Sequence, residues 1–199
     1  FYYDYSNLQV SKVQDRTIIV ENAAEAALYG GEVEFKAQLS DSFSIDGAAS
    51  YLNSEYKDFE SQDPGDFNPF DPAYQPPVQD LSGNQLYQAP KYTANFGAQF
   101  DWAVGDGQLG LRGEWNYVSR NYFTAFNNNI LSQPSYSKFN AFLTYNFPNQ
   151  DWSAMLYVRN ITNEWTKANS LMGAIDLGGP AVGGLTAPRT YGARLEYVF

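Results

Sequence analysis

Residues 109–117 read Leu109-Gly110-Leu111-Arg112-Gly113-Glu114-Trp115-Asn116-Tyr117, and apolar and polar side chains alternate along them. Successive side chains of a β-strand point to opposite faces, so this alternation predicts a strand with one apolar and one polar face. A helix would instead bring its apolar residues together every three or four positions. This stretch therefore decides the local fold in favour of a two-faced β-strand.

The same alternation extends over most of the chain of 199 residues. Eight strands are predicted, near residues 1–14, 18–39, 42–59, 86–102, 108–125, 135–147, 151–166 and 188–199. Several of them are longer than the strands of soluble proteins usually are. The sequence therefore predicts an all-β chain of antiparallel strands.

The connections between these strands alternate between short and long. Short ones lie at residues 40–42, 104–107 and 148–150, and long ones lie around residues 60–85, 126–134 and 167–187. Transmembrane β-barrels combine short turns at one end with longer loops at the other in this way. The predicted fold is therefore an antiparallel transmembrane β-barrel segment, and a soluble β-sandwich is the less favoured alternative because its strands are usually shorter.

Aromatic residues support the barrel, since they occur near both ends of the predicted strands. Trp102 and Trp152 flank short turns, whereas Tyr51, Tyr56, Tyr117, Tyr122 and Trp165 approach the long loops. Two belts of aromatic residues at the membrane interfaces would have this distribution.

Composition excludes several classes of function. The chain has 12 Lys+Arg against 22 Asp+Glu, a net charge of -10, which argues against nucleic acid as a partner. It has no Cys and no His, so thiol nucleophiles, Cys/His zinc sites and Ser-His-Asp triads are absent. We expect no enzyme, no catalytic residue, no cofactor and no metal site. An outer-membrane lipase or protease is a further alternative, which turnover assays on lipid or peptide would test.

One predicted loop is strongly acidic and rich in proline. Residues 58–80 contain six acidic residues and five prolines but no Lys or Arg. Carboxylates in such a loop could bind Ca²⁺, yet the spacing of Asp63 and Asp66 is not that of a dedicated calcium loop, and a solvated surface loop is favoured. The candidate ligand contacts are aromatic residues of two long connections: Phe67, Phe70, Tyr74, Phe123 and Phe126.

The final segment, residues 187–199, resembles the closing strand of TonB-dependent receptors. It places five residues on one face and ends on an aromatic carboxy-terminus: Tyr191, Ala193, Leu195, Tyr197 and Phe199. The resemblance implies that these residues form the signal read by the barrel-assembly machinery. Residues 22–34, 86–95 and 158–164 are similar to three further segments of that family, in matching order and spacing.

The resemblance implies what the whole protein would be. Residues 1–199 would be a partial barrel domain with about the last eight strands of a 22-stranded barrel, cut from a longer chain whose plug domain and TonB-contacting segment are missing. The expected function is TonB-dependent import of a ferric siderophore or another scarce nutrient across the outer membrane of a Gram-negative bacterium. Expected partners are outer-membrane lipid, the plug, the TonB complex, the barrel-assembly machinery and a small-molecule ligand. A self-contained eight-stranded barrel remains the alternative.

Overall fold

A computed structural model describes residues 1–14, 17–68, 70–71, 73–148, 151–172 and 179–198. These residues form one antiparallel sheet of eight strands in the order β1-β2-β3-β6-β7-β10-β11-β14. The strands are β1 (Tyr2–Gln14), β2 (Thr17–Ser40), β3 (Phe43–Asp58), β6 (Tyr92–Val104), β7 (Gly107–Val118), β10 (Tyr136–Asn146), β11 (Trp152–Arg159) and β14 (Thr190–Tyr197). The predicted all-β, antiparallel fold and its eight strands are confirmed.

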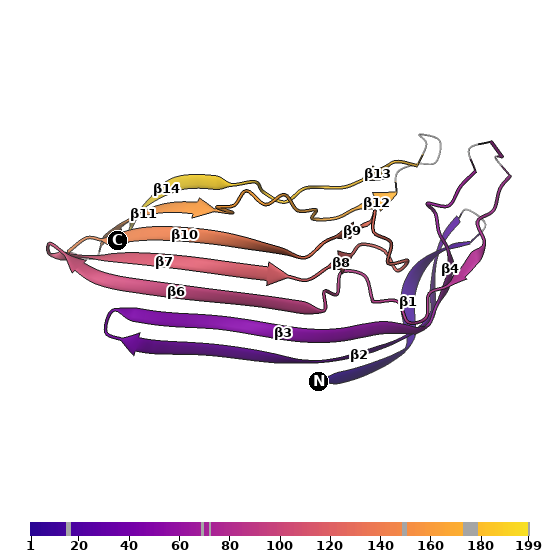
Figure 1. Ribbon diagram of the computed structural model, residues 1–199, viewed down its shortest axis with the longest axis horizontal. Helices are drawn as coiled ribbons and strands as arrows, with labels where there is room; N and C mark the ends of the chain where they lie inside the picture. The colour runs from indigo at the N-terminus through magenta and orange to yellow at the C-terminus, as the bar shows by residue number, and fades with distance from the viewer. Residues whose placement is uncertain (15–16, 69, 72, 149–150, 173–178, 199) are drawn as a thin grey trace.

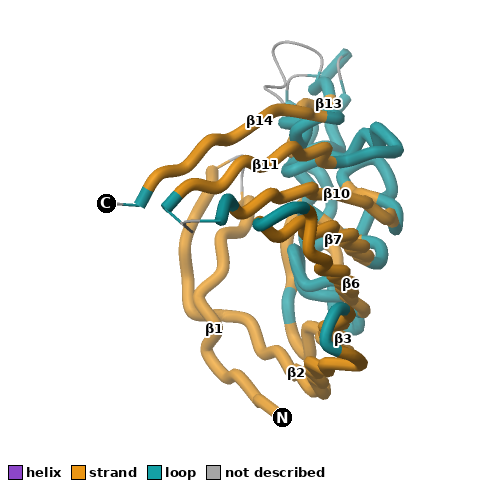
Figure 2. The backbone as a smooth tube through the Cα atoms, turned by 90° about the vertical axis from the view of Figure 1, so that its left-hand side faces the viewer, coloured by secondary structure: helices purple, strands orange, loops and turns teal. Residues whose placement is uncertain are grey.

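Each strand pairs with the one that precedes it in the sheet order, so the sheet is a continuous meander (Figure 1). Seen from the end that carries the short turns, it is a curved wall with β14 at one edge and β1 towards the other (Figure 2). Within the described residues, β1 and β14 do not pair with each other. The wall is therefore open, whereas a self-contained eight-stranded barrel requires its first and last strands to pair.

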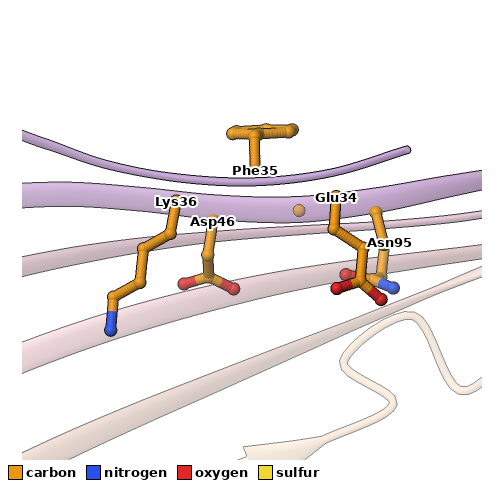
Figure 3. Close-up of a pocket in the computed structure, with 7 residues that line it drawn as sticks. Glu34, Phe35, Lys36, Asp46 and Asn95 are labelled. Carbon is orange, nitrogen blue, oxygen red and sulfur yellow. The ribbon is translucent and has the colours of Figure 1, made fainter.

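The two faces of the sheet differ in chemistry, as the alternation predicted. Figure 3 shows Lys36, Asp46, Glu34 and Asn95 pointing to the side on which the remaining strands lie, and Phe35 pointing to the opposite side. We call the polar side the inner face and the apolar side the outer face. Large apolar side chains are exposed on the outer face, among them Val33, Phe35, Phe96, Phe100, Leu111, Phe139, Leu156 and Leu195.

Three long connections leave the same end of the sheet, and each contains a small hairpin of its own (Figure 1). Loop 1 (residues 59–91) holds β4 (Glu60–Gln62) and β5 (Val78–Asp80), and loop 2 (residues 119–135) holds β8 (Asn121–Tyr122) and β9 (Ser132–Gln133). Loop 3 (residues 160–189) holds β12 (Leu171–Met172) and β13 (Ala181–Val182). The three predicted long connections and the short ones near residues 40–42 and 104–107 are confirmed, whereas residues 149–150 of the third short connection lie outside the described residues.

Three predicted strands were too long at the end near these loops. The strand expected over residues 86–102 begins only at Tyr92, because Gln88 has a positive φ of 56° and its N–H donates to the carbonyl of Tyr122 in loop 2. The strand expected over residues 108–125 ends at Val118, since the chain then turns away to form β8. The strand expected over residues 151–166 ends at Arg159, because Asn160 adopts a φ of 53°.

The predicted aromatic belts are correct in part. Tyr29, Tyr51 and Tyr92 lie in adjacent strands with ring centroids 6.3 and 5.4 Å apart, at the end of the sheet near the loops. At the other end the rings of Trp152 and Tyr197 are 4.8 Å apart. The prediction that Tyr56 belongs to the aromatic belt near the long loops was wrong, because its side chain is buried on the inner side of the sheet. Among the described residues, no helix is long and apolar enough to cross a membrane.

Candidate functional site

One row of paired residues crosses the inner face from β2 to β10. It consists of Lys36, Asp46, Gly97, Glu114 and Asn140, one from each of five adjacent strands. We call it the transverse row. Lys36 is positive, Asp46 and Glu114 are negative, and Asn140 is polar and uncharged, while Gly97 is the one position that has no side chain.

Arg112 bridges the gap above Gly97. Its Nη1 and Nη2 donate to the two carboxylate oxygens of Asp46 at 2.7 and 3.0 Å, and its Nε donates to Glu114 at 2.9 Å. A Cβ at position 97 would lie 2.8 Å from Asp46 Oδ2 and closer still to the guanidinium. The missing side chain therefore makes room for a two-pronged ion pair, the geometry that arginine forms best with a carboxylate.

The network continues towards loop 3. Asn140 Nδ2 donates to Glu114 at 3.3 Å, and the backbone N–H of Asn160 donates to Asn140 Oδ1 at 3.0 Å. A chain of polar contacts thus connects β3 with the start of loop 3. The row also borders an open hollow lined by Glu34, Lys36, Asp46, Ala48 and Asn95 (Figure 3). An open polar surface of this kind suits contact with a polar solute or a folded protein segment.

The loops form a second feature, which we call the cap. Its apolar core contains Tyr56, Phe59 and Leu81, which are 1%, 3% and 2% exposed, together with Val10, Ala24 and Ala26. Leu86 from loop 1 and Phe126 from loop 2 pack against this core. Since Tyr56 pairs with Ala26 on the inner side of β2 and β3, loops 1 and 2 fold inward over that part of the wall.

Loop 3 is closed at its base by one buried asparagine. Asn160 is 4% exposed; its Nδ2 donates to the carbonyls of Glu164 and Ala187 at 3.0 and 3.3 Å, and its Oδ1 accepts the N–H of Glu164 at 2.8 Å. Ala187 lies at the far end of the loop, so this side chain ties the two ends of loop 3 together. Residues 158–164 were noted in the sequence as similar to a family segment, but this role of Asn160 was not predicted.

The acidic residues of loop 1 mostly stabilise turns. Asp63, Asp71 and Asp80 each accept a backbone N–H from the residue two positions ahead, at 2.8 to 2.9 Å. These are Asx turns, which fix the local backbone. The hydroxyl and N–H of Ser82 lower the pKa of Asp80. Within the described part of the chain, no group of three or more acidic side chains converges on a potential metal site.

The five candidate ligand contacts lie in different surroundings. Phe70 of loop 1 is 94% exposed, while the ring of Phe67 lies against Gly179 of loop 3. The hydroxyl of Tyr74 donates to Asp66 at 3.3 Å; partial burial raises the pKa of Tyr74, and the charge of Asp66 raises it further. Phe123 is half-buried in loop 2, and Phe126 packs on the core of the cap. Their role as ligand contacts stays a prediction.

The predicted face of the last strand agrees with the register of β14. Tyr191, Leu195 and Tyr197 pair with Val158, Ala154 and Trp152 of β11, and Ala193 pairs with Leu156. Tyr191 and Leu195 are 82% and 65% exposed. Phe199 lies outside the described residues, and the reading of this face as an assembly signal stays a prediction.

A family model described as "TonB dependent receptor-like, beta-barrel" matches residues 1–161 of the chain. The chain belongs to this family. The resemblance noted from the sequence is therefore confirmed, and its family and structural neighbours are receptors and transporters, not enzymes. A comparison with curated proteins found no match.

Solved receptor structures share the fold of this TonB-dependent receptor-like barrel. The ferric yersiniabactin uptake receptor FyuA from Yersinia pestis has a TM-score of 0.76 at 21% identity, and the match covers 100% of this chain and 26% of FyuA. The siderophore receptor PiuA from Acinetobacter baumannii has a TM-score of 0.69 at 18% identity over 98% of this chain and 24% of PiuA. The chain thus spans about a quarter of the length of these structures.

Proposed function

We propose that the chain is the C-terminal part of the barrel wall of an outer-membrane receptor, which imports a ferric siderophore or another scarce nutrient in a TonB-dependent manner. The observation that carries this proposal is the open meander of eight strands with an apolar outer face and a charged inner face. Such a wall satisfies its backbone hydrogen bonds within a bilayer only when further strands close it into a barrel. Membership of the family and the names of the structural neighbours support the choice of ligand class.

In this proposal each surface has its own partner. The outer face contacts lipid of a Gram-negative outer membrane, and the inner face contacts a plug domain contributed by another part of the protein. The face of β14 that carries Tyr191, Ala193, Leu195 and Tyr197 is read by the barrel-assembly machinery. The segment that contacts the TonB complex belongs to another part of the protein. The cap lies on the external side of the membrane, where the ligand arrives.

The test is uptake by the full-length receptor. We expect the receptor to transport at least one member of a panel of ⁵⁵Fe-labelled siderophores or cobalamin in a host strain, and to lose that transport when tonB is deleted. Binding of the ligand should persist in the tonB strain, since binding does not require energy coupling. Uptake that is unaffected by loss of TonB, or full-length protein that lacks a plug and forms a closed eight-stranded barrel, would overturn the proposal.

The predicted ligand contacts are tested on the same receptor. Phe70→Ala should weaken binding by about tenfold if Phe70 is one of the few contact residues whose truncation costs more than about 1 kcal/mol. Val78→Ala is the matched control, since Val78 is a 60% exposed apolar residue of the same loop in β5. Equal affinities of both variants and the wild type would remove Phe70 from the set of ligand contacts.

A further inference from the structure

We propose that loop 2 fastens loops 1 and 3 into one rigid cap, so that the three loops move together and none of them opens alone. Loop 2 connects β7 and β10, and in the sheet order it lies between loop 1, which connects β3 and β6, and loop 3, which connects β11 and β14. In the sheet order it has a loop on each side, and loops 1 and 3 also meet directly where the ring of Phe67 lies against Gly179.

The contact between loops 1 and 2 centres on Asn127. The N–H of Gln85 donates to Asn127 Oδ1 at 2.8 Å, and Asn127 Nδ2 donates back to the carbonyl of Gln85 at 2.9 Å. Asn127 has a φ of 53°, a left-handed conformation that asparagine tolerates better than most residues. One side chain thus satisfies both backbone groups of a residue in the neighbouring loop, which fixes position as well as distance.

Two further hydrogen bonds join the same loops. Asn84 Nδ2 donates to the carbonyl of Ala125 at 2.9 Å, and the N–H of Gln88 donates to the carbonyl of Tyr122 at 2.8 Å. Below them, Leu86 and Phe126 pack on the same apolar core. Polar contacts and apolar burial therefore act on the same pair of loops.

The contact between loops 2 and 3 centres on Lys167. Its backbone N–H donates to Gln133 Oε1 at 2.7 Å, and its Nζ donates to the carbonyls of Ile130 and Ser132 at 2.8 and 3.1 Å. Gln133 and Ser132 form β9 and are 7% and 1% exposed. A charged donor that satisfies two carbonyls holds loop 3 to the buried side of loop 2.

The consequence concerns how a ligand would pass the cap. If the loops move together, an incoming ligand must enter beside the cap or displace all three loops at once. This consequence rests on the proposed uptake function. The measurement itself uses no ligand and no transport, so its failure and the failure of the proposed function are distinguishable.

The experiment is hydrogen exchange, followed residue by residue in the purified full-length receptor in detergent. Asn127→Gly removes the side chain and keeps the left-handed backbone free of strain. It should speed exchange at least tenfold at the amides of Gly83 and Gln88 in loop 1 and leave those of Ala168 and Thr186 in loop 3 unchanged. Lys167→Met should do the reverse. These reporter amides bond to other backbone carbonyls, so they report loosening of the loop and not the bond that was removed.

Asn128→Ala is the matched control. Asn128 is the same residue type in the same loop, but its Oδ1 accepts the N–H of Leu131 within loop 2. It should change neither set of reporter amides. Replacement of residues 123–131 by a Gly-Ser linker should release both sets, while protected amides in β7 and β10 show that the barrel is intact. Unchanged exchange in both loops after this replacement, or unprotected reporter amides in the wild type, would overturn the proposal.

Discussion

Position 97 shows how a residue without a side chain organises the charges around it. The guanidinium of Arg112 occupies the space where a Cβ would lie, and from there it reaches Asp46 on the far side of β6. Gly113 is the contrast, because a Cβ there would meet nothing within 4 Å. The two glycines lie in adjacent strands of the same sheet, yet only Gly97 is required by its surroundings.

Gly97→Ala should therefore displace the guanidinium and break the two-pronged ion pair. Both partners are about one-third exposed, so the expected loss is modest, about 1 kcal/mol of unfolding free energy. Gly113→Ala should be neutral within about 0.5 kcal/mol. Urea unfolding of the full-length receptor in bilayers measures both. The effect of Gly97→Ala should shrink in an Arg112→Met background, and an equal loss in the two backgrounds would contradict this account.

At the scale of single elements, the alternation of side chains predicted the strands but not where they end. Each strand depends on a local period of two, which is visible in the sequence. The ends depend on contacts made elsewhere. Gln88 leaves the sheet to donate to loop 2, and Asn160 ends β11 because its side chain bonds to both ends of loop 3. An asparagine after a strand indicates a turn, but the local sequence does not show that Asn160 bonds to Ala187, 27 residues away.

Asn160→Gly should release the base of loop 3 while the left-handed backbone is kept. The variant loses three hydrogen bonds of a buried side chain, worth about 2 kcal/mol in total. Limited proteolysis of the folded receptor should then cleave loop 3 more than about tenfold faster. Asn163→Gly is the control, because Asn163 also has a positive φ but accepts a single bond from Arg189. Its cleavage should increase less, and an equal increase would assign the effect to backbone flexibility.

At the scale of the whole molecule, the two faces of the sheet could be predicted from the sequence, but the contacts between strands and between loops could not. The polar residues of each strand were evident from alternation, whereas the register that aligns Asp46, Gly97 and Glu114 becomes visible only in the folded sheet. The same applies to the cap. Phe67 and Phe126 were predicted to contact a ligand because they are loop aromatics, and the structure shows what packs against each of them.

The assignment of the faces makes a prediction for the intact receptor. Phe139 and Asn140 are neighbours in β10 and point to opposite faces. Phe139→Lys should reduce stability in bilayers by about 2 to 4 kcal/mol, because a lysine would face lipid near the middle of the sheet. Asn140→Lys should cost less, since its ammonium would meet water and Glu114 on the inner face. Equal losses in urea unfolding would contradict the assignment of the faces.

The bridge from Arg112 to Asp46 also affects how the wall would yield to a pulling force. It joins β7 to β3 across the intervening β6, which is hydrogen-bonded to both. A hairpin without such a bridge can be peeled away one strand at a time. Here, detaching β6 also strains the ion pair above it, so removal of β6 from the membrane should meet somewhat more resistance than removal of a strand without such a bridge.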